Sequence, residues 1–417
     1  AKAPVGGEWN LDYRNRSAWS GARHDPEPPT AYHAHKDLTE EYQAITASGC
    51  EYFGESRHTD FPWPVTRAAA LDALEHFVTR ALPYFGTYQD AMHTGRPNLF
   101  HSRLSFALNV KLLSPTEVIE RALAERRRRG EGGVLATAAV PDVDTGAGGE
   151  SANAGPATAA VPDIDTGAGS ESANAGPAGT TSADAQPAGV RHTDGTSADG
   201  RPPIALNQIE GFIRQVAGWR EYMRVLYRRM MPDLTEMNAL GANLPLPAWY
   251  WNGETKMACL AHTIRDSLSN AYAHHIQRLM VTGTFAMIAG IDPNEVDAWY
   301  LGIYIDAFDW VERPNTRGMS QYADGGVIAT KPYAATASYI DRQSNYCRSC
   351  YYNRKTRTEV DSCPFNALYW DFYDRNRALV ANRRIRFVYP QLKKMDADEL
   401  RAIRERARDL KANLDRL

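Results

Sequence analysis

The chain has 417 residues and a formal net charge of −3 at pH 7, and 43% of its residues are hydrophobic. This length allows two or three domains with cores of their own, which excludes a small domain that depends on disulfides for stability. No run of 18 apolar residues and no secretory signal peptide is recognisable, so the sequence excludes a membrane-spanning helix and favours a cytoplasmic protein.

The N-terminal part begins with an irregular segment, residues 1–66. Because the chain starts with Ala1 rather than methionine, we expect that a further N-terminal portion precedes it. From residue 67 the pattern changes, and apolar residues recur at helical spacing from Leu71 to Leu82. The sequence therefore predicts the first part of a helical domain over residues 67–130.

Small hydroxyl residues mark two possible helix starts in this part. Ser102 and Ser105 precede an apolar run, and hydroxyl groups beside backbone amides at such a place can hold a phosphate. Ser114, followed by Pro115 and Glu117, has the pattern of an ordinary N-cap. We interpret Ser114 as a cap and keep Ser102 and Ser105 as candidate ligands.

Residues 131–203 contain an acidic, low-complexity insertion. Residues 131–200 carry a formal charge of −9, which leaves +6 on the rest of the chain, and a 22-residue motif from Ala136 recurs from Ala157. Large apolar side chains are too few to offset the entropy of ordering a repeat structure. We therefore expect a disordered loop that projects from the helical domain.

The remaining sequence, residues 204–335 and 336–417, again predicts helices, over 207–230, 257–289, 293–310 and 396–415. It shows no convincing alternation typical of strands and no glycine-rich phosphate-binding motif. The fold class that these patterns predict is mainly α.

Two adjacent histidines, His274 and His275, lie in an otherwise apolar run that also contains Arg278. On a helix, successive residues point about 100° apart, so one ring can face a pocket while the other supports it. A histidine that titrates near neutrality suits proton donation. The alternative is that one of them completes a hydrogen-bond network in the core.

The run from Asp306 to Asp324 combines acidic, amide and glycine residues. Asp306 and Asp309 have the i,i+3 spacing of one helix face, and Pro314 with Asn315 is expected to end that helix. Such a polar loop can hydrogen-bond the edge of a heterocycle, although ordinary helix-end chemistry would explain it equally well.

Four of the five cysteines form one pattern, in which Cys259 precedes Cys347, Cys350 and Cys363. In a chain of this size, clustered cysteines favour a metal site over disulfides. Four thiolates suit a [4Fe–4S] cluster or zinc, and the number of ligands does not separate the two. Cys50 lies outside the pattern and is interpreted as an ordinary thiol.

Together the motifs resemble the iron–sulfur bacterial cryptochrome/photolyase family, the prokaryotic (6-4) photolyases. The resemblance rests on EGFIRQVAGWREY (210–222), AYAHHIQRLMV (271–281), YIDAFDWVERPNTRGMSQYADGG (304–326), TKPY (330–333) and YCRSC…SCPFNALYW (346–370). It covers the chain from Gly6 onward, apart from residues 131–200.

The resemblance implies an all-helical FAD-binding domain with a C-terminal helical [4Fe–4S] region, and a role for each matching residue. His275 matches the catalytic histidine, with His274 beside it, and Gln215 matches a residue next to the lesion. Electron transfer is implied for Trp299, Tyr300, Trp251 and Tyr339, FAD contacts for Ser102, Leu104, Ser105, Glu210, Arg278, Asp306 and Asn315, and cluster ligation for Cys259, Cys347, Cys350 and Cys363.

Two features depart from the family pattern. The N-terminal α/β domain that carries a lumazine antenna has no counterpart in this sequence, so the resemblance implies an incomplete antenna site. The acidic repeat also has no counterpart. A charge of −9 would repel DNA, so we expect this segment to lie away from the DNA-binding face.

These expectations lead to one main hypothesis and two alternatives. The main one is a monomeric enzyme that repairs UV-damaged DNA without a membrane partner, by light-driven electron transfer from reduced FAD to a flipped-out (6-4) lesion. In it His275, as imidazolium, donates a proton. The first alternative is a cryptochrome-type blue-light photoreceptor. The second is a flavin-free iron–sulfur DNA-binding domain similar to the large subunit of primases.

Overall fold

The computed structural model describes residues 4, 6–8, 10–21, 36–50, 58–130, 201–380, 385 and 388–417. Within these ranges the fold is mainly α with isolated bridges and no strand, which confirms the predicted class. The acidic segment 131–200 lies outside the described residues, so its expected disorder stays a prediction. The described residues contain no helix both long and apolar enough to span a bilayer.

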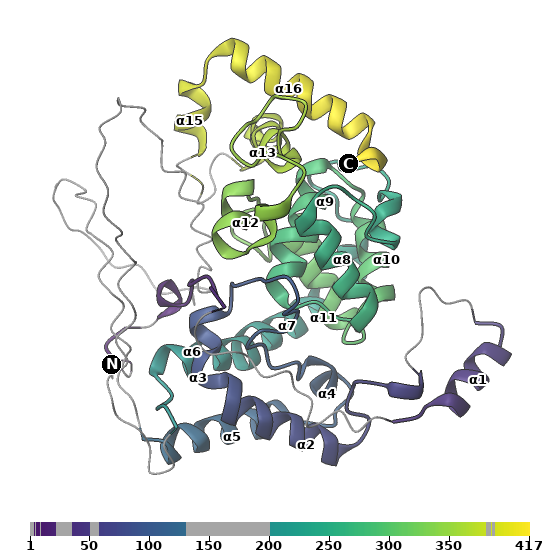
Figure 1. The fold of residues 1–417 in the computed structure, drawn as a ribbon, viewed down its shortest axis with the longest axis vertical. Coiled ribbons are helices and arrows are strands. Elements are labelled where there is room, and N and C mark those ends of the chain that lie inside the picture. The colour runs from purple at the N-terminus through teal and green to yellow at the C-terminus, as the bar shows by residue number, and fades with distance from the viewer. Residues whose placement is uncertain are drawn as a thin grey trace.

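The first half of the molecule is a group of helices around one apolar core. Figure 1 shows these helices in the lower part of the view. Some of them precede the acidic segment in the sequence and others follow it. Phe77, Val78, Leu82, Phe85 and Phe212 are buried there together. The elements are α2 (Arg67–His76), η3 (Phe77–Ala81), α3 (Leu82–Tyr88), α4 (Ser105–Asn109), α5 (Pro115–Arg128), α6 (Leu206–Ile213), η4 (Arg214–Trp219) and α7 (Arg220–Met230).

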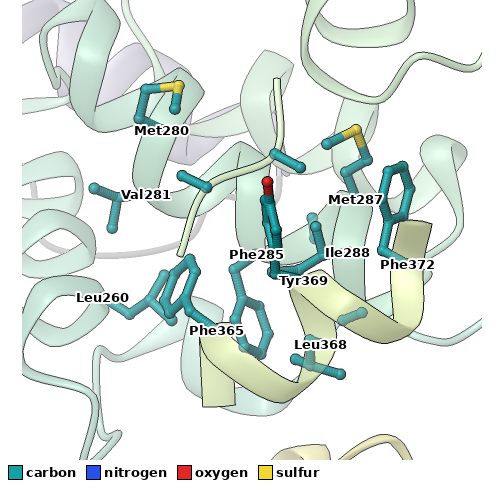
Figure 2. Close-up of a cluster of buried hydrophobic side chains, with 14 of the residues drawn as sticks. Leu260, Met280, Val281, Phe285, Met287, Ile288, Phe365, Leu368, Tyr369 and Phe372 are labelled. Carbon is teal, nitrogen blue, oxygen red and sulfur yellow. The ribbon is translucent and has the colours of Figure 1, made fainter. Parts of the chain in front are cut away.

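The second half packs around a larger core, in which α13 lies against α9. Figure 2 shows Phe285, Phe365 and Tyr369 among the buried side chains of this contact. The main elements are α8 (Ala258–Asn270), η7 (Gln277–Gly283), α9 (Thr284–Ala289), α10 (Pro293–Ile303), α11 (Asp309–Arg313), η8 (Pro314–Ser320), α12 (Ala337–Gln343), α13 (Pro364–Arg375), α14 (Arg377–Val380), α15 (Val388–Lys394) and α16 (Ala397–Ala412).

Short elements complete the described fold. The segment 1–66, expected to be irregular, contains α1 (Thr39–Ala47), which Figure 1 shows at the edge of the molecule. Ser114 is an N-cap as predicted, because its hydroxyl accepts the Glu117 N–H at 3.1 Å. The remaining 3₁₀ turns are η1 (Asp12–Arg14), η2 (His58–Asp60), η5 (Asp233–Glu236), η6 (Ala248–Trp251), η9 (Tyr346–Ser349) and η10 (Leu414–Arg416).

Three helix expectations need correction. The helix predicted over 257–289 breaks at Ala271, which has a left-handed φ of 49°, so His274 precedes the next helical segment. Asp306 and Asp309 do not share a helix face, because Asp306 lies in the turn before α11. Pro314 does not end its helix. It opens the π turn η8, whose wider spacing accommodates a ring that would clash inside a regular α-helix.

In the described ranges, four π turns interrupt the helices: η3, η4, η7 and η8. The turns η7 and η8 are in contact at Gly283, where an added Cβ atom would strike the Ser320 hydroxyl of η8 and would lie 2.7 Å from the Arg278 carbonyl oxygen of η7 itself. Only glycine therefore allows this close approach. π turns within α-helices frequently occur at functional sites, and η4, η7 and η8 all contribute residues to the cavity described next.

Candidate functional site

A cavity of about 310 Å³ lies between the two halves of the molecule. Its lining comes from α3, the loop before α4, η4, η7 and η8, so segments about 200 residues apart meet at one place. The volume is at the lower end of the range of small-molecule sites. Among its lining residues are the predicted site residues Ser102, Ser105, Gln215, His275, Arg278, Tyr300, Asp306 and Asn315.

Other predicted residues do not line this cavity. Leu104 is buried before α4, and Glu210 forms an ion pair with Arg214 one turn further along. Trp299 lies behind Tyr300, at a ring-centroid distance of 5.4 Å. His274 is fully buried behind the cavity wall. Their proposed contacts with a cofactor or substrate stay predictions.

Asp306 is the anchor of one wall. The Arg278 guanidinium donates to both of its oxygens, at 2.9 and 3.1 Å, and the Ser105 hydroxyl donates to one of them at 2.5 Å. The Asn109 side chain donates to the Asp306 carbonyl oxygen at 2.8 Å. The turn before α11 is therefore fixed to η7 and to α4, and Arg278 is held at the cavity.

Glu312 also lines the cavity, although sequence reasoning did not select it. Burial raises the pKa of Glu312 to about 7, and the nearby carboxylates of Asp306 and Asp297 add to the shift against the opposing charge of Arg278. Thr316 donates a hydrogen bond of 2.5 Å to this carboxyl. A carboxyl group that titrates near neutrality in a cavity is a candidate functional group. The only available sequence signal was its place between Asp306 and Asn315.

Asn315 was expected to face a heterocycle, but its amide is engaged within the protein. Its Nδ2 donates to the Val311 carbonyl at 2.7 Å, and its Oδ1 accepts the Trp219 indole N–H at 2.8 Å. Asn315 thus links η8 to η4 across the cavity, and any contact with a ligand would use the remaining hydrogen-bonding capacity of the amide.

His275 lines the cavity at the start of the helical segment that continues as η7. Burial and the positive charge of Arg278 lower its pKa to about 4. The lowered pKa favours the neutral ring although the His275 side chain is exposed at the cavity, and the expected imidazolium stays a prediction. A charged His275 requires negative charge brought into the cavity by a ligand.

Aromatic rings continue inward from the cavity. Tyr300 contacts Trp299, whose ring centroid is 5.4 Å from that of Tyr250, and Tyr250 stacks on Trp249 at 4.6 Å. Sequence reasoning missed Trp249 and Tyr250, although both adjoin the predicted Trp251. Trp251 itself is 39% exposed.

Tyr339, the fourth residue predicted for electron transfer, lies elsewhere. It is buried on α12, with the Arg342 guanidinium carbon 5.8 Å from the ring centroid. Within the part of the chain that the structure describes, it makes no ring contact with the Tyr300–Trp299–Tyr250–Trp249 series.

The four patterned cysteines lie on three elements of the second half. Cys259 is in the first turn of α8, Cys347 and Cys350 lie in and just after η9, and Cys363 is the N-cap of α13. Cys363, Cys347 and Cys350 add to the effect of burial in raising the pKa of Cys259, so the four thiols share one neighbourhood. No group of three or more His, Cys, Asp or Glu residues in the described ranges has the geometry of a formed metal site.

The donor set nevertheless fits a metal centre bound by sulfur. Soft thiolates are the ligands that zinc and iron–sulfur clusters prefer, and a buried thiol neighbourhood reached by three elements suits either. Asn366 holds the loop between Cys350 and Cys363 by donating to the carbonyl oxygens of Arg354 and Thr356, at 2.9 and 2.8 Å. Cys50 is exposed and is not among the thiols that influence Cys259.

Comparisons with known proteins give consistent results. A family model described as deoxyribodipyrimidine photo-lyase-related protein matches residues 1–61. A (6-4) photolyase of Agrobacterium fabrum is 38% identical over 416 residues, which cover 99% of this chain and 66% of the relative. The chain thus spans somewhat less than two thirds of that relative's length.

Two further matches cover smaller shares or show weaker likeness. The uncharacterized protein R855 of Acanthamoeba polyphaga mimivirus is 33% identical over 93 residues, which are 22% of this chain and 72% of the relative. Among solved structures, a bacterial class III photolyase from Agrobacterium tumefaciens aligns with a TM-score of 0.40 and 16% identity, over 82% of this chain and 50% of that chain.

Proposed function

The chain belongs to the deoxyribodipyrimidine photolyase-related family, and we propose that it is a light-driven DNA repair enzyme of the (6-4) photolyase type that acts as a monomer on UV-damaged DNA. One observation carries the proposal. Predicted cofactor residues, Ser102, Ser105, Arg278 and Asp306, line the same cavity as His275 and Gln215, the residues predicted to act on the lesion.

The cavity wall suits FAD in its chemistry. Groups that can donate to phosphates include the Ser102 hydroxyl and the Arg103 Nε, which has no hydrogen-bond partner among the described residues. The Ser105 hydroxyl donates to Asp306 instead. Flat apolar surface comes from Phe212 and Leu279. When bound and reduced, FAD would supply the electron that light transfers to the lesion. Arg278, fixed by Asp306, would hold negative charge at this wall.

We assign contact with a flipped-out base to His275 and Gln215, which both line the cavity. Flipping costs a few kcal/mol and costs least at a damaged, poorly stacked site. Negative charge from the lesion's phosphates and the cofactor would raise the pKa of His275 from about 4 and charge its ring. His275 would then donate its proton to the lesion. The +6 formal charge outside residues 131–200 favours binding to DNA phosphates.

Two supporting roles follow from the aromatic rings and the cysteines. We assign Tyr300, Trp299 and the partly exposed Trp251 to electron transfer between the cavity and solvent, with Tyr339 at a separate place. We assign Cys259, Cys347, Cys350 and Cys363 to a [4Fe–4S] cluster with a structural role, because its ligands would tie α8, η9 and α13 together. Cys350→Ala should abolish soluble, flavin-loaded protein, whereas exposed Cys50→Ala should leave its yield unchanged.

The test of the function is light-dependent repair by the purified protein. Its absorption spectrum and the chromophore released by acid come first, followed by repair of DNA that carries a single (6-4) lesion. His275→Ala should lower repair by about 10²- to 10⁴-fold, the contribution of a general acid, with unchanged flavin content. The control His76→Ala, on α2 outside the cavity, should repair normally. Full repair by His275→Ala would refute its role, and flavin photoreduction without repair would favour a photoreceptor.

A further inference from the structure

A third imidazole, that of His101, lies in the cavity wall. The ring of His101 stacks on that of His274 with centroids 4.3 Å apart and planes inclined by only 8°. His101 lines the cavity, whereas His274 is fully buried and precedes His275 in the chain. Three histidines from two distant segments therefore meet at the place where a proton donor is proposed, and the proposed function assigns no task to His101.

The backbone on both sides of the stack adopts a conformation that L-residues rarely occupy. Leu99 and Arg103, which flank His101, have φ values of 39° and 54°, and Ala271, three residues before His274, has 49°. A non-glycine residue held in this region costs about 1–3 kcal/mol and persists only where the surroundings fix it, most often at functional sites. The chain is thus strained at each segment that brings the two rings together.

The stacked pair is poorly suited to carry a proton. Both ring nitrogens of His274 and the Nε2 of His101 lack a hydrogen-bond partner among the described residues. An imidazolium donates from both nitrogens, so protonation of either ring would bury an unsatisfied N–H. His101 forms a hydrogen bond with the Gln89 backbone. His275 differs because its side chain is exposed at the cavity, where a ligand can accept its proton, and neither of its ring nitrogens is a buried atom without a partner.

The charges around the three rings act in the same direction. Burial and His275 lower the pKa of His101 to about 3, and burial with the charges of His101, His275 and Arg278 lowers that of His274 well below its usual value. The other titratable groups that line the cavity are Asp90, Arg103, Arg220, Tyr272, Tyr300, Asp306 and Glu312. Asp306 is engaged by Arg278, and burial raises the pKa values of Asp90 and Glu312 to about 7.

We propose that His101 is a positioning residue for His275: by stacking on His274 it keeps that ring fixed and neutral, so that the proton of the site resides on His275 alone. This inference rests on the proposed function, in which His275 is the proton donor. In this inference the stacked face of the His101 ring, rather than its nitrogens, fixes the ring of His274.

The experiment separates the ring of His101 from its nitrogens. His101→Phe keeps a flat ring against His274 and removes both nitrogens, whereas His101→Ala removes the ring. Repair per bound flavin is measured from about pH 5 to pH 9. The ¹⁵N shifts of the imidazoles in the full chain are followed down to about pH 3, which covers the lowered pKa values of His275 and His101. His76→Ala serves as the matched control.

The proposal expects His101→Phe to repair within about threefold of the unmodified chain, with the same pH profile. It expects His101→Ala to lose at least about tenfold, with His274 now titrating toward the usual histidine pKa of about 6.5. Unchanged repair and pH profile in His101→Ala would overturn it. So would a loss in His101→Phe as large as in His101→Ala, because the nitrogens would then be the acting part.

The imidazole titration keeps the inference separate from the proposed function. If the unmodified chain repairs no lesion, the proposed function fails, and the order of protonation still decides the role of His101. His275 must be the first of the three histidines to take up a proton as the pH falls. Protonation of His101 or His274 first would overturn the inference even in an active enzyme. If His101→Ala does not fold, repair by His101→Phe and the order in which the three histidines are protonated decide whether the inference holds.

Discussion

The pKa values of two buried glutamates in this molecule are shifted in opposite directions. Glu125, near the end of α5, is fully buried, and Glu312, at the cavity, is 7% exposed. Burial would raise the pKa of Glu125, but hydrogen bonds from Arg128, Arg129 and Arg121 lower it to about 2. Burial raises the pKa of Glu312 to about 7, and no guanidinium donates to it in the described structure. Three guanidinium groups donate to Glu125 and favour its charged form, whereas Glu312 lacks such donors in the described structure and burial favours its neutral form.

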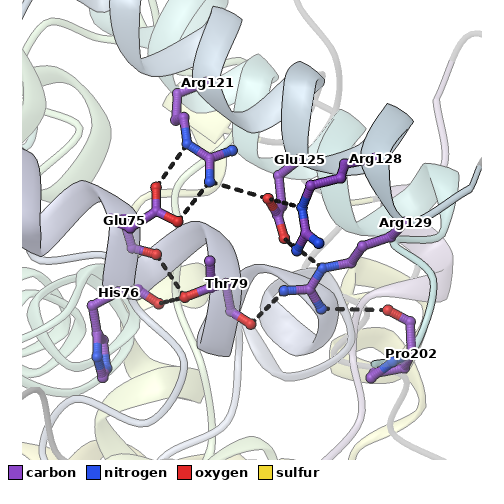
Figure 3. Close-up of polar contacts among 8 residues, drawn as sticks. All are labelled: Glu75, His76, Thr79, Arg121, Glu125, Arg128, Arg129 and Pro202. Atoms are coloured by element: carbon purple, nitrogen blue, oxygen red, sulfur yellow. Dashed lines mark hydrogen bonds and ion pairs between the residues drawn. The ribbon is translucent and has the colours of Figure 1, made fainter. Parts of the chain in front are cut away.

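The difference separates a structural site from a chemical one. Figure 3 shows Glu125 between three arginines, with Arg129 also donating to the carbonyl oxygens of Thr79 and Pro202, at 2.5 and 3.4 Å. This network (Glu125, Arg121, Arg128, Arg129) joins α5 to η3 and to the chain that re-enters after the acidic segment. Its hydrogen-bonding capacity is largely used internally. The cavity retains groups that can still exchange a proton or accept a ligand.

The largest expected effect tests the arginine network. Glu125→Ala would leave Arg129, whose side chain is 1% exposed, as a buried charge without its carboxylate partner. Breaking such a pair typically costs about 3–5 kcal/mol of unfolding free energy. Denaturant unfolding measures the loss. Arg401→Ala, which removes an ion pair exposed by 65% and 77% at its two ends, is the control and should change stability by less than about 1 kcal/mol.

The second prediction concerns the sign of the pH dependence. The low pKa of Glu125 adds stability that is present above about pH 4.5 and is lost as the pH falls toward 2. The raised pKa of Glu312 adds stability that is present below about pH 4.5 and is lost as the pH rises through about 7.

Each residue can contribute a slope of at most about 1.4 kcal/mol per pH unit. Unfolding free energies of Glu125→Gln and Glu312→Gln, measured against the unmodified chain over about pH 3–8, should therefore differ from it with opposite slopes. Slopes of the same sign would show that the two glutamates do not differ in the way described. The flavin content of each sample is matched, because a bound ligand would change the charge around Glu312.

The smallest expected effect concerns the acidic segment. The residues on either side of it are joined directly, since Arg126 donates to the Ile204 carbonyl at 3.2 Å and Arg129 to that of Pro202. Replacing residues 131–200 by an eight-residue Gly/Ser linker should change the unfolding free energy by no more than about 2 kcal/mol, in the stabilising direction, because a shorter loop costs less entropy to close. Flavin content and repair should stay the same. A loss of bound flavin would show that the acidic segment contributes to cofactor binding.

The sequence predicted the helices better than the interruptions between them. Apolar periodicity was sufficient for α2, α7 and α16, because each buries one face against a single core. It did not predict the break at Ala271 or the continuation through Pro314, since both depend on how η7 and η8 pack. A left-handed alanine and a proline inside a helix are unfavourable locally and are stabilised only by tertiary contacts.

The same reasoning applies to the site. Motif resemblance selected His275, Arg278 and Asp306, and the structure places all three at one cavity. It did not select Glu312 or His101, because their properties come from burial and from neighbours far away in sequence. It also assigned Asn315 to a ligand. The structure shows its amide hydrogen-bonded to Trp219 and Val311, and the ligand contact stays a prediction. Contacts between distant segments carry this information, and a single sequence does not contain them explicitly.

The π turns at the cavity determine how the lining helices respond to the loss of a residue. A π turn holds one residue more than the α-helical turn it replaces, and the helix on each side keeps its register. One residue can therefore be removed from η4, η7 or η8 without rotating the flanking helices by the roughly 100° that a deletion from a regular helix would cause. Single-codon deletions, rather than substitutions, are thus a direct route to reshape this cavity.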